Sequence, residues 1–153
     1  MPFRLDDYNY LGSITGVVNS EDIATVSKAR RYRLGDLQLK IMRVLWERAE
    51  ATVTDVYQAL GRQTGLAYTT IATMLRKMES RGLVRHRTEG RRFIYSAAVE
   101  SHAITRSMAD DLIDRVFEGS LADMVSHLLS TREVSGDELR QLERLIAERK
   151  KQT

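Results

Sequence analysis

YTTIATMLRKMESRG, at residues 68–82, is the stretch that decides the fold of this chain. Its apolar side chains, from Ile71 to Met78, recur at intervals of three and four residues and therefore share one face of a helix. Gly82 stands where a helix of this length needs a residue in the left-handed conformation at its C′ position. The pattern predicts a helix over about 68–81 that is buried on one face only.

Two more helices are expected before this stretch. One begins at Asp36, because the apolar residues that follow it keep the helical period. The second has Thr54 as its N-cap, since a threonine hydroxyl can accept a hydrogen bond from the first turn of a helix. Gly61 or Gly65 would end this second helix.

Two β-favouring runs follow, at 83–88 and 91–96, and the residues between them are Glu89 and Gly90. Such runs around a glycine-containing turn predict a β-hairpin. The order helix, helix, helix, hairpin is that of a winged helix-turn-helix, in which the hairpin is the wing. We expect a mainly α fold, with a winged-helix DNA-binding domain over 34–98.

The remaining residues, 99–153, have the pattern of three helices. The first would stop at Gly119, and Ser135 with Glu138 forms a capping box that would open the last. A region this small is marginal on its own, which favours helical dimerisation, although packing onto its own winged domain stays open. The residues expected between two chains are Ile113, Val116, Phe117, Leu128 and Leu142.

Residues 1–33 are unlike the rest of the chain. The stretch 11–18 could form a short strand, but glycine and serine interrupt it, and 28–33 are rich in basic residues. We interpret 1–33 as a poorly ordered N-terminal arm. The alternative is a translation start at Val26, which the sequence does not decide.

The charge is unevenly distributed. The net charge is +3, yet 34–98 carry 11 basic against 6 acidic residues, and 99–153 carry 8 against 11. A basic middle and an acidic end indicate that one part of the chain faces a polyanion. An ordinary solvated charged face is the alternative.

Several classes of protein are excluded or disfavoured. The absence of cysteine excludes disulfides and thiolate metal sites, and no apolar run is long enough to insert into a membrane. With no secretory signal pattern, we expect a cytoplasmic protein. His86, His102 and His127 match no metal or catalytic spacing, so we expect no metal, no cofactor and no enzyme.

The candidate DNA contacts lie on the helix of 68–81 and on the wing. Opposite its apolar face the helix carries small hydroxylic side chains, which fit the major groove of double-stranded DNA and can contact base edges. Basic residues at its flanks and on the wing would contact phosphates. A solvent face and a charge-protected edge strand are the alternatives. The candidates are Tyr68, Thr69, Thr70, Ala72, Thr73, Arg76, Lys77, Arg91 and Arg92.

Several segments resemble the penicillinase and methicillin-resistance repressors, the BlaI/MecI family. They are LGDLQ at 34–38, IMRVLW at 41–46, VTDVYQAL at 53–60 and LAYTTIATML at 66–75, followed by GLV at 82–84 and FIY at 93–95. The resemblance extends over about 34–150. It implies a homodimer that binds a pseudopalindromic operator through its winged heads, with the C-terminal helices joining the two chains.

The resemblance also implies a signal. Repressors of this family often control β-lactam resistance, and a membrane sensor metalloprotease relieves repression by cleaving the dimerisation region. The staphylococcal members are cut between Asn and Phe, whereas the corresponding residues here are Asp111 and Leu112. The cleavage site and the protease partner are therefore open.

Two rivals to an operator-binding repressor remain. A ligand-sensing winged-helix regulator would have a sizeable apolar pocket between the dimer helices and the wing. A winged-helix module that binds only proteins would need neither a basic wing nor a threonine face. The sequence favours the repressor, because it has both.

Overall fold

The computed structural model describes residues 32–153, which form two compact units. The first ends at Met108 and the second is Ala109–Thr153. The arm predicted at 1–33 and the alternative start at Val26 lie outside the described residues, apart from Tyr32 and Arg33.

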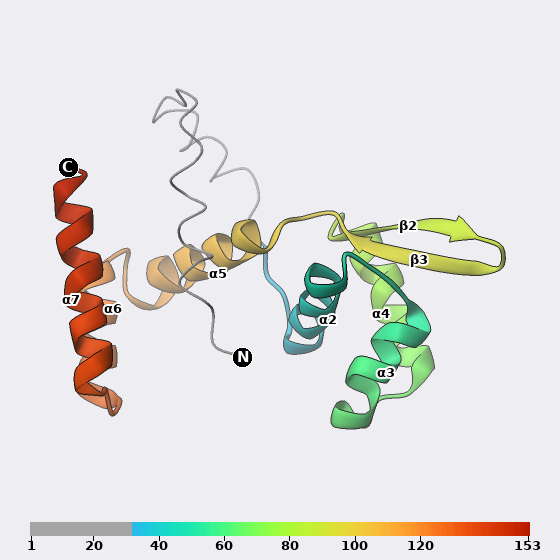
Figure 1. Cartoon of the computed structure of the whole chain (residues 1–153), viewed down its shortest axis with the longest axis horizontal. Helices are drawn as coiled ribbons and strands as arrows, with labels where there is room; N and C mark the ends of the chain where they lie inside the picture. The colour runs from blue at the N-terminus through green and yellow to red at the C-terminus, as the bar shows by residue number, and fades with distance from the viewer. Residues whose placement is uncertain (1–31) are drawn as a thin grey trace. The chain divides into compact units, whose positions relative to one another are not determined.

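Three helices of the first unit form the predicted helical core (Figure 1). They are α2 (Asp36–Arg48), α3 (Val53–Thr64) and α4 (Tyr68–Ser80). Each buries one apolar stripe, because residues three and four apart share a face. Ile41, Val56 and Ile71, one from each helix, are 0% exposed. Gly82 follows α4 with a φ of +77°, as the sequence predicts.

The wing belongs to a three-stranded antiparallel sheet. Its strands are β1 (Glu50–Thr52), β2 (Val84–Glu89) and β3 (Arg92–Ala97), in the order β1-β3-β2. The hairpin of β2 and β3 is the predicted one, but each strand lies one residue further along the chain. Its turn is Gly90–Arg91, and Gly90 has a φ of +61°. Strand β1 was not predicted from the sequence.

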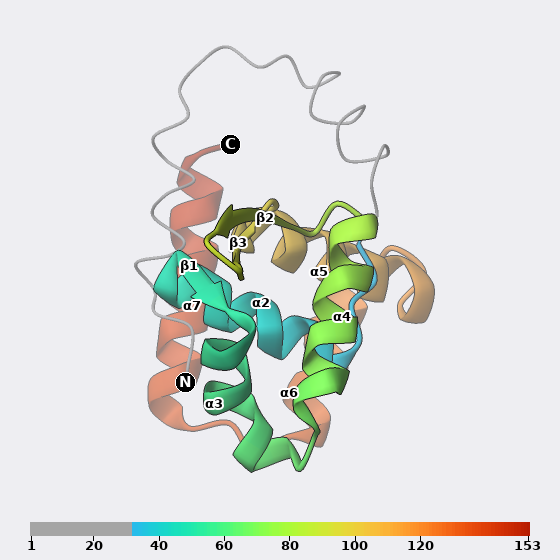
Figure 2. The same ribbon diagram turned by 90° about the vertical axis from the view of Figure 1, so that its right-hand side faces the viewer.

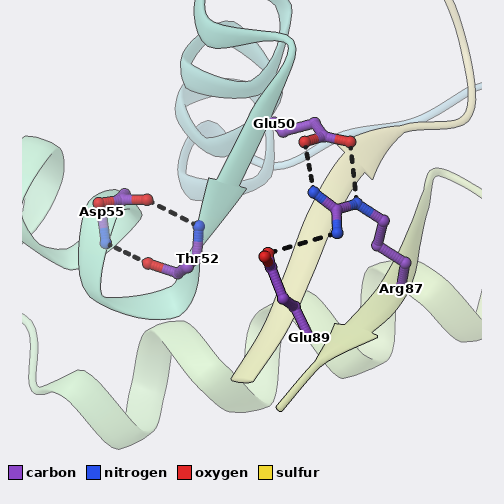
Figure 3. A network of polar contacts seen from close by, with 5 residues as sticks. All are labelled: Glu50, Thr52, Asp55, Arg87 and Glu89. Atoms are coloured by element: carbon purple, nitrogen blue, oxygen red, sulfur yellow. Dashed lines mark hydrogen bonds and ion pairs between the residues drawn. The ribbon is translucent and has the colours of Figure 1, made fainter. Parts of the chain in front are cut away.

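Helix α3 begins two residues earlier than predicted. Its N-cap is Thr52 rather than Thr54, and Figure 3 shows the reason. Thr52 Oγ1 accepts a hydrogen bond from Asp55 N at 3.1 Å, and Asp55 Oδ2 accepts one from Thr52 N at 2.9 Å. This reciprocal pair is a capping box with aspartate in place of glutamate.

Gly65 ends α3 in the left-handed conformation and its N–H donates to Gly61 O at 2.9 Å. Gly61, the other candidate, lies inside the helix. A Cβ there would lie 2.6 Å from the ring of Tyr57, so this glycine allows a close approach of the aromatic side chain.

Helix α5 (Ser101–Val116) begins in the first unit and runs into the second. Ile104, near its start, is 1% exposed in the core of the winged-helix unit. The indole of Trp46 donates to Val99 O at 2.9 Å just before the helix. These contacts tie the beginning of α5 to the helices and sheet that precede it.

The second unit contains the end of α5 together with α6 (Leu121–Thr131) and α7 (Gly136–Lys151). The three tail helices occur as predicted, and Ser135 Oγ accepts a hydrogen bond from Glu138 N at 3.1 Å. No residue of Ala109–Thr153 is buried. Its exposed large apolar side chains are Leu112, Val116, Leu121, Leu128, Leu129, Leu139, Leu145 and Ile146.

Within residues 32–153, every helix is too short or too polar to cross a bilayer.

Candidate DNA interface

Helix α4 separates its apolar residues from its polar ones. Ile71, Leu75 and Met78 are 0% exposed against the core, whereas Thr69 and Thr73 on the opposite side are exposed. Because the side chains of this outer face are short, the helix backbone can approach a flat or grooved partner closely. The face has the size and chemistry that reading base edges requires.

A groove of about 360 Å³ lies between the start of α3, α4 and the wing. Three elements that are separate in the sequence therefore meet at one surface; Figure 2 shows the helices and the hairpin from the side of the wing. The groove brings together five of the nine predicted contact residues: Tyr68, Ala72, Arg76, Arg91 and Arg92.

The other four predicted residues line a second, shallower hollow of about 250 Å³ along α4. They are Thr69, Thr70, Thr73 and Lys77, and Met74 completes the lining. The groove and the hollow both lie along α4, so all nine residues belong to surfaces built on this helix and the wing.

The sequence did not indicate several residues of the groove. Thr52, Val53 and Thr54 reach it because α3 begins there, and Phe93 and Tyr95 reach it from β3. The signal for the helix start was present, since Thr52 and Asp55 have capping-box spacing. Backbone N–H groups at the start of a helix favour negative charge, and here Thr52 and Asp55 form the cap.

The groove combines positive charge with aromatic surface. Arg76, Arg91 and Arg92 are exposed along it, and Tyr68 and Phe93 are 46% and 42% exposed. The pKa of Asp55, the residue after Thr54, is lowered mainly by its hydrogen bonds with Thr52 and additionally by nearby arginines that include Arg92. The surface is suited to a phosphate backbone with its adjoining sugars and bases.

The wing is attached to α4 through His86 on β2. His86 Nδ1 lies 2.6 Å from Glu79 Oε2, and the imidazole stacks on Phe93 with a centroid distance of 4.3 Å. Glu79 lies in the last turn of α4, so the contact joins the helix to the wing directly. The position of the wing is thereby tied to that of the helix.

Four of the five predicted dimerisation residues lie on the helices of the tail, and Phe117 directly follows α5. Val116 and Leu128 are 62% and 37% exposed, whereas Ile113, Phe117 and Leu142 are half-buried within a single chain. The predicted cleavage residues, Asp111 and Leu112, lie inside α5. Asp111 accepts a hydrogen bond from Arg115 Nη1 at 3.3 Å, one turn further along the helix.

Comparison with known proteins agrees with this geometry. Residues 34–148 match the family model described as "Penicillinase repressor". The penicillinase repressor of Bacillus licheniformis is 26% identical over 118 residues, which are 77% of this chain and 92% of that protein. The transcriptional regulator BlaI of Mycobacterium tuberculosis is 33% identical over 122 residues, 78% of this chain and 87% of that one.

One similar solved structure is that of monomeric Bacillus licheniformis BlaI in complex with the blaP half-operator. It is 26% identical, covers 48% of this chain and 90% of that chain, and has a TM-score of 0.43. The family match and the relatives carry the assignment: this chain belongs to the penicillinase repressor family, whose members are DNA-binding transcriptional repressors rather than enzymes.

Proposed function

We propose that this chain represses transcription as a homodimer bound to a pseudopalindromic operator, with α4 of each head in the major groove. One observation carries the proposal: the start of α3, the outer face of α4 and the wing arginines converge on one groove. A DNA backbone passing along this groove would place its bases against α4.

The chemistry of the side chains indicates which residues would contact bases and which would contact phosphates. Thr69 and Thr73 would contact bases, because a threonine offers both a hydroxyl and a methyl group to a base edge. Arg76, Arg91 and Arg92 would contact phosphates, which give affinity without sequence information. Tyr68, Ala72, Thr70 and Lys77 would complete the interface from the same surfaces.

Self-association is supported by the exposure of the tail. No residue of the second unit is buried in one chain, and eight large apolar side chains are exposed between residues 112 and 146. Large apolar side chains exposed in this number favour association with a partner surface. A second copy of the tail would cover it and join two heads, with Ile113, Val116, Phe117, Leu128 and Leu142 at the interface.

For induction we propose cleavage at Asp111–Leu112 by a membrane-bound sensor metalloprotease, in the cytoplasm where the operator lies. The proposal rests on the resemblance of the chain to its family. Its physical consequence is clear, because a cut inside α5 separates α6 and α7 from the winged head. Proteases bind extended chain, so the helix must open locally around Leu112 before it is cut.

The test is selection of DNA from a random-sequence pool by the intact protein, followed by footprinting on the selected site. We expect two inverted half-sites, about one helical turn or a multiple of it apart, as two symmetric heads require. Recovery of no preferred sequence, or of a single unrepeated half-site, would contradict the proposal.

A further inference from the structure

Arg87 is a wing arginine outside the groove, and two carboxylates hold its guanidinium (Figure 3). Nε donates to Glu50 Oε1 at 3.1 Å and Nη2 donates to Glu50 Oε2 at 2.9 Å. The third nitrogen, Nη1, donates to Glu89 Oε2 at 3.4 Å. Every nitrogen of the guanidinium therefore has a carboxylate partner.

The register of the sheet explains this arrangement. Arg87 on β2 and Thr52 on β1 both pair with Ile94 of β3, and Glu50 pairs with Ser96. Because side chains alternate between the two faces of a sheet, Arg87 and Glu50 share the face opposite to buried Tyr95. The hairpin residues that line the groove are Arg91, Arg92, Phe93 and Tyr95, so Arg87 is outside its lining. Arg92 pairs with Glu89 and therefore shares the face of the sheet from which Arg87 extends.

Glu50 and Arg87 each favour the charged form of the other. The hydrogen bonds and the charge of Arg87 lower the pKa of Glu50, and Glu50 in turn raises the pKa of Arg87. One guanidinium between two carboxylates leaves a local charge of −1. Because these three side chains are exposed, their ion pairs add little to the stability of the fold. Their main effect is on the binding of a charged partner.

We propose that Glu50 is a positioning residue that withholds Arg87 from DNA and so sets how many wing arginines reach the phosphate backbone. The inference rests on the proposed function, because it applies only to a head that binds DNA. Arg91 and Arg92 would supply the phosphate contacts of the wing, while Arg87 stays with Glu50 and Glu89. The sequence-independent attraction of each head for DNA is limited accordingly.

The test uses the full chain, a mixed-sequence duplex of about 40 base pairs, and binding measured over about 50–300 mM salt. Glu50→Gln removes the carboxylate that holds two nitrogens of Arg87 and leaves only the 3.4 Å contact with Glu89, so the plot of log affinity against log salt should steepen by up to about 0.9 for each head. At about 0.1 M salt, affinity should rise by as much as ~8-fold for each head. Glu47→Gln, the same charge change at an exposed position of α2, is the matched control and should leave the slope unchanged.

Two further variants separate release of Arg87 from a change in charge. Arg87→Gln should keep the original salt slope, because the wild-type side chain makes no phosphate contact. Glu50→Gln combined with Arg87→Gln should also return to the original slope, since the net charge is conserved and no arginine remains to be released. Far-ultraviolet circular dichroism checks that each variant is folded.

The possible failures are distinguishable. A loss of about 0.9 in slope per head for Arg87→Gln, or a Glu50→Gln slope equal to that of Glu47→Gln, would overturn the inference and leave the proposed function standing. Arg91→Gln is the reference for a true phosphate contact. If the intact chain did not bind the duplex, or Arg91→Gln left the slope unchanged, the proposed interface would be wrong and this inference with it.

Discussion

The wing arginines of the groove provide the most quantitative prediction. Each phosphate contact contributes about 0.9 to the slope of log affinity against log salt. Replacing Arg91 and Arg92 together by Ala should therefore flatten the slope by about 1.8 for each head. At about 0.1 M salt the same loss weakens binding roughly 60-fold for each head.

The structure also ranks the two residues. Arg91 lies in the turn of the hairpin, whereas Arg92 pairs with Glu89 across the hairpin and interacts with Asp55 at the start of α3. The carboxylate of Asp55 thus attracts Arg92 within the protein, and among the described residues Arg91 shows no such interaction. Arg91→Ala should flatten the slope more than Arg92→Ala.

Fluorescence anisotropy of a labelled duplex, repeated at several salt concentrations, measures both slope and affinity. Lys40→Ala with Arg43→Ala is the matched control, because it removes two exposed cations from α2, outside the groove and the hollow. Its slope should stay close to that of the unmodified protein. If the control and the wing variant lost equal slope, net charge rather than the groove would determine binding.

Three other substitutions test separate parts of the account. Thr73→Ala should weaken binding to the selected operator by about 1–3 kcal/mol and binding to random DNA much less, measured by parallel titrations; equal losses would remove it from base reading. Asp55→Asn should destabilise the fold above about pH 4, where the lowered pKa of Asp55 keeps the carboxyl ionised. The loss of stability should shrink as acid protonates the wild-type carboxyl, and a pH-independent difference in urea unfolding would contradict the capping role. Leu75→Ala should lower the free energy of unfolding by about 2–5 kcal/mol, because its side chain is fully buried; a loss below about 1 kcal/mol would be inconsistent with that burial.

The sequence predicted those features that depend on neighbouring residues, such as which face of a helix is buried. The helical period placed Ile71 and Leu75 inward and Thr73 outward, and a single helix is enough to define those directions. Strand β1 has only three residues and depends on pairing with β3, more than 40 residues later, so no local pattern could indicate it. Thr54 was chosen as N-cap because it adjoins the apolar stripe, whereas the capping box with Asp55 selects Thr52.

The groove could not be predicted from local sequence either, because its residues come from elements that are distant in the chain. Arg91 and Arg92 stood out by charge, but Phe93 and the start of α3 join them only through the packing of the sheet against the helices. In the tail, the helical period indicated one apolar stripe for each helix. It did not indicate which residues of a stripe pack within the chain and which stay exposed. Packing within the chain half-buries Phe117 and leaves Val116 62% exposed, a difference the pattern alone does not contain.

Two heads should bind one operator because the exposed apolar side chains of the tail join them. The direct measurement compares the intact chain with Val116→Asp on a full operator and on a half-site, with sedimentation of both proteins. Val116 is largely exposed in one chain, so the charge should disturb association rather than folding. We expect a dimer that becomes a monomer, with full-operator affinity reduced by about 10²-fold or more and half-site affinity unchanged. An intact chain that sediments as a monomer at micromolar concentration, or a monomeric Val116→Asp variant that binds the full operator as tightly as the intact chain, would contradict the account.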